Sequence, residues 1–577
     1  MRKKEFHHFI ILSFFIVAII FSNFELPLFL SVENGSNFYE NVRKMEFEAK
    51  LAEDSLESLD IYRTTVIVKN QVLNISGTLR IHDNGTLILI NSTLKMDTRF
   101  IKSNIIVFNS GNLTLINSTV TSLAPHFHYC IRVTNESALY IKNSQISYVC
   151  IEILNDSSLL INDSKISYAG YKAPPVSQSE QQHLTNLNNS GILSSPTYHI
   201  TQNALYVMES SVTIAYSTFQ DIELGLVFYR IRNCKVINNT FSGGEFFGIS
   251  ESDGCVVTNN TLTSADIWIL NTNNTNVTDN MVIGGNINVE DSVNIHVARN
   301  LVYTSRGIGI YIYKRVPGMC VIKDNKLIKC GFFIDGEKQA LTGVLLEGNM
   351  INNKPLTFIF NASNRKYTFK NSVGQVIVIY SENITIQNTQ LSDTSDAILV
   401  INSANLLLTD NTVTNNGIGI SFWTSANCEI RDSSITNNEW GIYLVKSINN
   451  TIAGNLIRNN SYGIYLKKAQ NTKIIGNVIQ ENRYGIHLYY VTNTTMENNT
   501  FIDNTKDIYK LPGGRETPNL FVYLGILLLG LAVTVMFIIV YVKHKRKNFS
   551  KIKSTKIKSQ KKIILDIQKD NAKHSIP

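Results

Sequence analysis

The chain has 577 residues, 44% hydrophobic and 17% charged, a composition that excludes intrinsic disorder and predicts several domains or one repeating domain. The formal net charge of +8 comes from the two ends of the chain, chiefly the Lys-rich residues 543–577, and the body between them is mildly acidic. Because nucleic acids bind proteins through cationic surfaces, this distribution argues against a nucleic-acid partner.

Residues 1–30 have the pattern of a secretory signal. A basic start precedes an uncharged block from Phe9 to Phe21, and an apolar stretch this short does not span a bilayer. No Ala-x-Ala cleavage site is evident, so we expect a cleaved signal peptide and keep an uncleaved signal anchor as the alternative. Residues 31–63 are charged and helix-compatible in their second half, and we expect them to cap the region that follows.

Residues 64–504 contain an internal repeat that is strictest at its C-terminal end. Four glycines share one position of the repeat and lie 22 residues apart: Gly419, Gly441, Gly463 and Gly485. Apolar residues within each period occur at positions i and i+2, which is typical of β-strands. Because short strands recur with no helix between them, each period is predicted to be one coil of a right-handed, single-stranded parallel β-helix. Looser spacing toward the N-terminus gives about 17 coils, with longer segments after Ile166 and Ile351.

Asparagine marks two further positions of the coil. One column holds Asn416, Asn438, Asn460, Asn482 and Asn504, and another holds Asn411, Asn455, Asn477 and Asn499, with Ser433 substituting once. Asn tolerates the left-handed conformation that a tight corner needs, and its amide can bond the Asn of the next coil, so we expect structural ladders. A carbohydrate-facing role for these columns is the alternative.

Many asparagines also begin N-x-S/T sequons, although the repeat itself inflates their number. If the host glycosylates secreted proteins, several of these asparagines are acceptor candidates. The candidates are Asn74, Asn84, Asn112, Asn155, Asn238, Asn361 and Asn493.

The C-terminal residues predict a membrane anchor. After a short linker at 505–518, residues 519–542 carry no charge and are long enough to cross the bilayer as one transmembrane helix. The tail at 543–577 is rich in lysine, so the positive-inside rule places the tail in the cytoplasm and the β-helix outside the cell. We therefore expect a single-pass protein of the cell membrane.

The seven cysteines are expected to be free thiols, mostly in the core. Four of them occupy a coil position that small hydrophobic residues take elsewhere: Cys234, Cys255, Cys320 and Cys428. Neighbouring pairs, such as Cys130 and Cys150, would lie within disulfide reach, so a bridge is the alternative.

The sequence contains no catalytic or cofactor motif. His126, His128 and Cys130 come nearest to a metal cluster, but a turn before a strand is the commoner setting for such residues, so we expect no metal and no cofactor. Four carboxylates could be brought together only by the stacking of coils: Asp266, Glu290, Asp335 and Glu347. Whether the protein is an enzyme is therefore uncertain, and a role without catalysis is preferred.

Two aromatic columns give the best functional indication. Trp440, Tyr462 and Tyr484 form one column, and Tyr443, Tyr465 and His487 form the other, on the outward side of the strands. Exposed rings in a row can stack against sugars and use their polar tips for hydroxyls, so these residues are the carbohydrate-stacking candidates. The alternative is that the stacked rings only cover a corner of the coil.

Four segments of the sequence carry a family resemblance. They are the run Asn-Asn-x-Tyr-Gly-Ile-Tyr-Leu at 459–466, the run at 471–479, and the segments 352–356 and 374–377. They resemble the NosD-like group of parallel β-helix repeat proteins, which includes carbohydrate-binding and sugar-hydrolase members. The resemblance implies the fold and a carbohydrate-related role. NosD itself assists copper delivery in the periplasm, but no Met/His/Cys cluster is visible here, so copper is not carried over.

We therefore expect a membrane-anchored cell-surface glycoprotein that binds or presents glycans, or that serves as a surface scaffold. Its partners would be glycans or other cell-surface components, together with the membrane that anchors it. The alternative function is that of a polysaccharide lyase or glycoside hydrolase whose carboxylates converge only in the folded chain.

Overall fold

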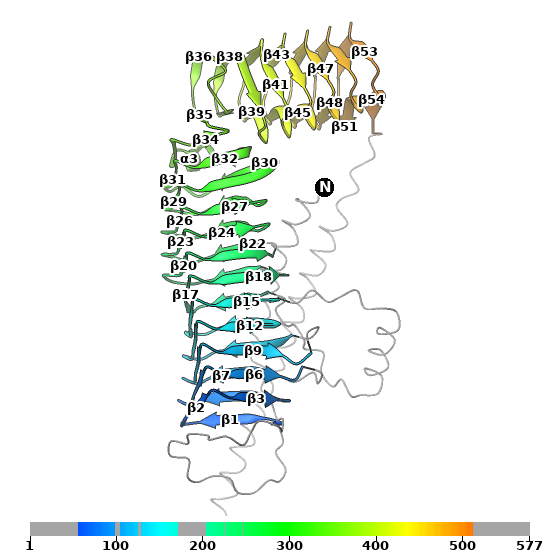
Figure 1. Ribbon diagram of the computed structural model, residues 1–577. Helices are drawn as coiled ribbons and strands as arrows, with labels where there is room; N and C mark the ends of the chain where they lie inside the picture. The colour runs from blue at the N-terminus through cyan, green and yellow to red at the C-terminus, as the bar shows by residue number, and fades with distance from the viewer. Residues whose placement is uncertain are drawn as a thin grey trace, which may run out of the picture. The chain divides into compact units, whose positions relative to one another are not determined.

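The computed structural model describes residues 56–98, 104–124, 128–170, 203–223, 225–244 and 246–511. These residues form a parallel β-solenoid of about 19 turns (Figure 1), which confirms the predicted all-β parallel β-helix. The count from the sequence omits two coils. One contains Leu73, whose register partner is Leu94. The other contains β35 (Lys354–Phe360) and β36 (Ser363–Lys370), and most side chains of β36 are exposed, so it lacks the apolar pattern.

Each coil contributes short strands whose parallel partners lie in the coils before and after it. In the first coil these strands are β1 (Leu59–Tyr62), β2 (Thr65–Lys69) and β3 (Val72–Ile75). Apolar alternation directs every second side chain inward, so Leu87 and Leu89 on β5 (Thr86–Ile90) are fully buried. Columns of such residues bury apolar surface along the whole solenoid, which is the main stabilising contribution.

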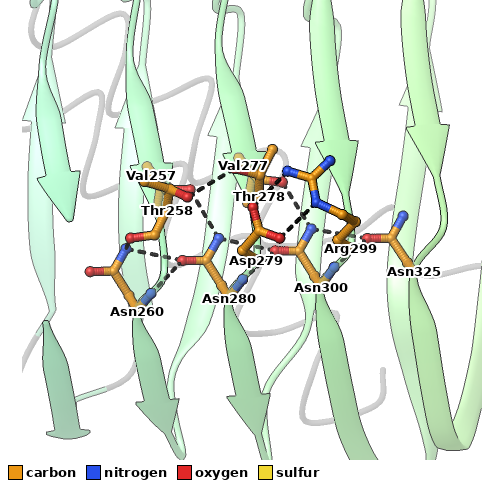
Figure 2. A network of polar contacts seen from close by, with 10 residues as sticks. All are labelled: Val257, Thr258, Asn260, Val277, Thr278, Asp279, Asn280, Arg299, Asn300 and Asn325. Carbon is orange, nitrogen blue, oxygen red and sulfur yellow. Dashed lines mark hydrogen bonds and ion pairs between the residues drawn. The ribbon is translucent and has the colours of Figure 1, made fainter. Parts of the chain in front are cut away.

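Asparagine ladders link the coils at their turns, as the sequence predicts. Figure 2 shows the ladder Asn260, Asn280, Asn300 and Asn325. The Asn280 Nδ2 donates to Asn300 Oδ1 at 3.0 Å and to the Val257 carbonyl oxygen at 2.9 Å. The column from Asn416 to Asn504 makes the same bonds from each amide to the next. These asparagines are therefore structural residues.

The left-handed conformation predicted for the ladder asparagines is found one residue earlier. The backbone φ is 57° at Asp279, before Asn280, and 66° at Asn415, before Asn416. The ladder residue stays in line with the stack because its own backbone N–H also bonds the next coil, as from Asn280 to Asn300 Oδ1 at 2.9 Å. The predicted position was therefore wrong by one residue: one residue forms the left-handed corner, and the asparagine after it forms the ladder.

A hairpin divides the solenoid into two stacks. The last elements of the first stack include the strands β30 (Leu301–Lys314) and β32 (Lys326–Gly336), the helix α3 (Lys338–Leu341) and the strand β34 (Met350–Ile351). β34 then pairs antiparallel with β35. Asn352 and Asn353 between them have φ of 50° and 62°, the left-handed pair typical of a tight hairpin. We call β1–β34 the first stack and β35–β54 the second stack.

The second stack covers the open end of the first. Its first full-length inner strands are β37 (Gln375–Ile379) and β39 (Asp396–Ile401). Their alternate residues Ile377, Ile379, Leu399 and Ile401 belong to the hydrophobic core of the first stack, which also contains Phe332. The residues between them, such as Val378, belong to the core of the second stack. The single continuous β-helix predicted over 64–504 is therefore two cores that share one sheet, because these strands are apolar on both faces.

The buried side chain of Gln375 completes the hydrogen bonding at this junction. Its Oε1 accepts from the Phe332 backbone N–H at 2.8 Å, and its Nε2 donates to the Phe332 carbonyl oxygen at 2.8 Å. The same Nε2 donates to the Asp396 carbonyl oxygen at 2.8 Å. The side-chain amide thus takes the place of a backbone amide from a further strand, which satisfies a buried strand edge.

Both ends of the solenoid extend beyond the predicted range. β1 begins at Leu59, within the predicted cap, and β54 (Lys506–Lys510) lies within the predicted linker. β54 follows because Ile508 continues the 22-residue register of Ile486. The signal region, most of the cap, the anchor at 519–542 and the tail lie outside the described residues. Among the described residues, no helix is long and apolar enough to span a membrane.

Candidate functional site

The predicted aromatic columns form on one sheet of the second stack. They lie on β45 (Trp440–Val445), β48 (Tyr462–Lys467) and β51 (Tyr484–Tyr489). On β45, Ile442 and Leu444 point into the core, so Tyr443 points outward. The strand register aligns Trp440, Tyr462 and Tyr484 in one column and Tyr443, Tyr465 and His487 in the other.

Neighbouring rings within these columns are in contact. The Trp440 and Tyr462 rings are nearly parallel, with centroids 6.0 Å apart, and the Tyr462 and Tyr484 rings are nearly parallel, with centroids 5.1 Å apart. In the second column, Tyr465 lies 5.2 Å from Tyr443 and 4.6 Å from His487. Such contacts hold the rings in fixed orientations, which lowers the entropy cost of stacking a ligand on them.

The exposure of the rings differs between the two columns. Trp440, Tyr462, Tyr484 and Tyr465 are partly exposed, whereas Tyr443 is 6% exposed and His487 is 8% exposed. The expectation that all six rings are exposed is therefore wrong for Tyr443 and His487, because the neighbouring rings cover them. These two residues support the accessible rings.

His487 is a buried polar residue inside the aromatic cluster. Neither of its ring nitrogens has a hydrogen-bond partner among the described residues. Burial lowers the pKa of His487 below its ordinary value of 6.5, so the ring is neutral at pH 7. A neutral imidazole can donate one hydrogen bond and accept another.

The structure extends these columns with rings that the sequence interpretation missed. Trp423, on β42 (Ile418–Trp423), meets the Tyr443 ring edge to face at 5.6 Å. Trp423 also meets Phe333 of the first stack at 5.6 Å, and Phe333 stacks on Tyr311 at 5.8 Å. At the other end Tyr509 lies 4.9 Å from His487. We call this set the aromatic face: Tyr311, Phe333, Trp423, Trp440, Tyr443, Tyr462, Tyr465, Tyr484, His487 and Tyr509.

Part of this extension has a signal in the sequence. Tyr509 follows His487 by 22 residues, and Phe333 follows Tyr311 by the same interval. The contact between Phe333 and Trp423 has no such signal, because it depends on how the second stack meets the first.

Two of the four predicted carboxylates share one column beside this face, with a tyrosine between them. The register of β28 (Ile287–Glu290), β30 and β32 aligns Glu290, Tyr313 and Asp335 in one column. Both carboxylates raise the pKa of Tyr311, after the larger effect of its burial. Burial also raises the pKa of Asp335, although the Gly336 N–H donates to its Oδ1 at 2.7 Å.

The other two carboxylates are engaged elsewhere. Asp266 lies on the same sheet, on β25 (Asp266–Leu270), where its Oδ1 accepts from the Asn286 N–H at 2.9 Å. Glu347 ends β33 (Val344–Glu347) on a different sheet and lies 3.3 Å from the Lys323 ammonium group. Glu347 is therefore not part of the cluster.

Cations lie over the rings at the C-terminal end of the aromatic face. The Lys506 ammonium group is 4.7 Å from the centre of the Tyr509 ring and 6.0 Å from that of Tyr484. The Arg483 guanidinium lies 5.5 Å from the centre of the Tyr484 ring. The second-stack end of the face therefore carries two cations beside its rings.

The described cysteines and histidines form no metal site. All seven cysteines are free, and the four predicted core cysteines are buried in the two cores. His128 Nε2 is 2.7 Å from the Tyr168 carbonyl oxygen, and His126 lies outside the described residues. Across the part of the chain that the structure describes, no group of three or more His, Cys, Asp or Glu side chains could hold a metal ion.

The sequon asparagines lie at the surface to different degrees. Asn84, Asn155, Asn361 and Asn493 are exposed, whereas Asn74, Asn112 and Asn238 are partly buried. Exposed amides are accessible to a glycosylating enzyme, so the first four remain the better candidates. Glycosylation itself stays a prediction.

Family comparisons agree with the fold. Residues 361–518 match the family model described as periplasmic copper-binding protein (NosD), and residues 103–282 and 224–373 match the right handed beta helix region. These matches confirm the resemblance to NosD-like parallel β-helix proteins. None of the curated proteins matches the chain.

Solved structures with similar strand arrangements have low sequence identity. The periplasmic alginate epimerase AlgG is 12% identical, with 76% of this chain and 78% of that chain covered and a TM-score of 0.15. The Azotobacter vinelandii mannuronan C-5 epimerase AlgE6 A-module is 12% identical, with 74% and 87% covered and a TM-score of 0.18. The alginate lyase AlyF-OU02 is 11% identical, with 75% and 83% covered and a TM-score of 0.20. Similarities this weak carry no argument about activity.

Proposed function

We propose that this parallel β-helix protein, which is similar to the NosD family over residues 361–518, is a membrane-anchored surface protein that binds glycans along its aromatic face. The aromatic face carries this proposal, since its rings touch one another across both stacks. Aromatic rings stack on the apolar faces of sugars, and tyrosine and tryptophan also offer polar tips. The anchor follows from the uncharged residues 519–542 and the lysine-rich tail.

The test is glycan binding by the full chain, purified in detergent and applied to an array of immobilised polysaccharides. Replacing Tyr462 or Tyr465 by alanine removes an accessible ring, and each loss is worth about 0.5–1.5 kcal/mol, or about twofold to tenfold in affinity. Tyr216→Ala is the matched control, because Tyr216 is 61% exposed and lies outside the aromatic face. Equal binding by all four proteins would refute the proposal.

A second function has one supporting observation. Glu290 and Asp335 lie in one column on either side of Tyr313, and two carboxylates are the groups that cleave glycosidic bonds in many hydrolases. A lyase or hydrolase would release unsaturated or reducing ends from a bound polysaccharide. An assay for such ends distinguishes an enzyme, which releases them, from a glycan-binding protein, which retains the polysaccharide without cleaving it. A pure scaffold would neither bind nor cleave the polysaccharide.

A further inference from the structure

The last coil of the second stack is formed by β52 (Thr495–Glu497), β53 (Thr500–Ile502) and β54. Each of these strands continues an inward column of apolar residues, at Met496, Phe501 and Ile508. Ile486, which precedes Ile508 in its column, is fully buried, whereas Ile508 is 50% exposed. None of the described strands pairs with the outer edge of this coil. The described residues therefore leave the core uncovered at β52–β54, which we call the open end.

An outward column also changes from polar to apolar at the open end. This column runs through Thr436, Arg458 and Gln480 before it reaches Ile502. Ile502 is 38% exposed, so it adds to the apolar surface that Ile508 presents on the same coil. Large apolar side chains that remain exposed together mark an interaction surface.

Lysines accompany the apolar residues of the open end. Lys510 is exposed and aligns with Leu488, which lies in the core one coil earlier. A lysine on an edge strand opposes pairing with another chain, and its stem can cover apolar surface while the ammonium group stays in a polar layer. Lys506 and the partly exposed Tyr509 lie on the same strand. Exposed isoleucines beside lysine and tyrosine are typical of a membrane–water interface.

Little chain separates the open end from the proposed anchor. The uncharged segment 519–542 begins eight residues after Leu511, the last residue that the structure describes. Even a fully extended chain covers no more than about 3.6 Å per residue, so this stretch reaches no further than about 30 Å. The bilayer is therefore a large surface within reach of the open end.

We propose that the open end rests on the headgroup region of the lipid bilayer that anchors the chain. Ile502 and Ile508 enter the apolar boundary of that region, and the Lys506 and Lys510 ammonium groups stay among the headgroups. The contact stays at headgroup depth, because the backbone groups of an unpaired strand edge need water or headgroup oxygens as partners. This inference rests on the membrane anchor of the proposed function and adds a second, surface contact between the solenoid and the membrane.

The test places a tryptophan at the open end of the full chain, reconstituted in phosphatidylcholine vesicles. A fraction of the lipid carries a nitroxide on its headgroup, which quenches tryptophan fluorescence at short range. Ile508→Trp is the reporter, and Leu345→Trp is the matched control, because Leu345 is 52% exposed and lies on β33 of the first stack. After subtraction of the wild-type signal, quenching is expected to be at least about twofold greater at position 508 than at position 345. Equal quenching at the two positions would overturn the inference.

Two further measurements separate the possible occupants of the open end. Protection of the tryptophan at 508 from aqueous acrylamide, without quenching by the lipid, would show that a second copy covers this end and would overturn the lipid contact. Ile502→Trp replaces Ile508→Trp if the melting temperature of the latter shows that it does not fold.

Vesicle flotation separates this inference from the proposed function. A chain that floats with the vesicles but shows no lipid quenching at 508 keeps the anchor and refutes the contact of the open end. A chain that does not float refutes the anchor and, with it, this inference. Glycan binding by the aromatic face is measured independently and decides neither.

Discussion

The two stacks build the same coil with different regularity. In the second stack the asparagine ladder from Asn416 to Asn504 advances by 22 residues at each step. In the first stack the steps vary: Ser118 bonds Ser144 across 26 residues, and Ser164 bonds Ser217 across 53 residues at 3.1 Å. The ladder bond keeps its length although the chain between its ends more than doubles. The turn contacts therefore set the cross-section of the coil, whatever the length of the chain between them.

The ladder also changes its chemistry along the first stack. Its first members are serines, and Ser144 Oγ accepts from the Ser118 N–H at 3.0 Å and donates to Lys142 within its own coil. From Asn239 onward the members are asparagines, each of which also donates to the preceding coil, as Asn239 does to the Ile214 carbonyl oxygen. Asparagine coils thus have more bonds between neighbours than serine coils.

The largest expected effect comes from breaking the junction between the stacks. Leu399 is fully buried in the first-stack core although it belongs to a second-stack strand. Leu399→Ala should lower the free energy of unfolding by about 2–5 kcal/mol through lost burial and the cavity left behind. Chemical denaturation, with amide exchange at β32, measures this loss.

Leu456→Ala is the control for that prediction. Leu456 lies on β47 (Leu456–Arg458) and is 39% exposed, so its truncation should cost no more than about 0.5 kcal/mol. Equal losses in the two variants would show that the second stack does not cover the first-stack core.

The difference between asparagine and serine ladders predicts the next largest loss of stability. Asn280→Ala removes the bonds from Asn260 and those to Val257 and Asn300, and should cost about 2–4 kcal/mol. Ser144→Ala removes one bond between coils and should cost about 1–2 kcal/mol. Urea denaturation of both variants, with Asn280→Ser as an intermediate, tests the order. A larger loss at Ser144 would contradict the comparison.

Acidification should destabilise the second stack through His487. Burial holds the pKa of His487 below 6.5 in the folded chain, so protons bind preferentially to the unfolded chain and stability falls as the pH drops below that value. His487→Tyr, which matches the tyrosines of its column, should reduce this pH dependence. Melting temperatures measured between pH 7.5 and pH 5 test this, and parallel curves for the two proteins would exclude a role for His487.

The smallest effect is expected at an exposed ion pair. Arg299 Nη2 lies 2.6 Å from Asp279 Oδ2, and Figure 2 shows this pair, but the Arg299 side chain is 54% exposed. Because solvent screens exposed pairs, Arg299→Ala should leave the melting temperature almost unchanged. A large decrease would mean that surface charges contribute to coil stacking as much as the ladders do.

The sequence predicted the second stack better than the junction. The 22-residue columns and the asparagine positions are local patterns, so the coil, the ladder and the two aromatic columns could be inferred from them. The junction depends on contacts between distant residues, such as Phe333 with Trp423. One signal was available: β37 and β39 read as continuous apolar runs, which is typical of strands buried on both faces.

The alignment of the two carboxylates could not be predicted from the sequence either. Glu290 and Asp335 are 45 residues apart, and only the irregular register of β30 with β32 aligns them through Tyr313. Exposure could not be inferred either, since Tyr443 and His487 have the outward position but are covered by neighbouring rings.

The most direct test of the aromatic face compares one ring from each stack. Tyr311→Ala and Tyr462→Ala alter rings on the first and second stack, and glycan affinity of each full-length variant is measured against wild type after its melting temperature confirms folding. A single binding face predicts that both variants lose about twofold to tenfold in affinity for the same polysaccharide. Unchanged affinity in both variants would contradict the account.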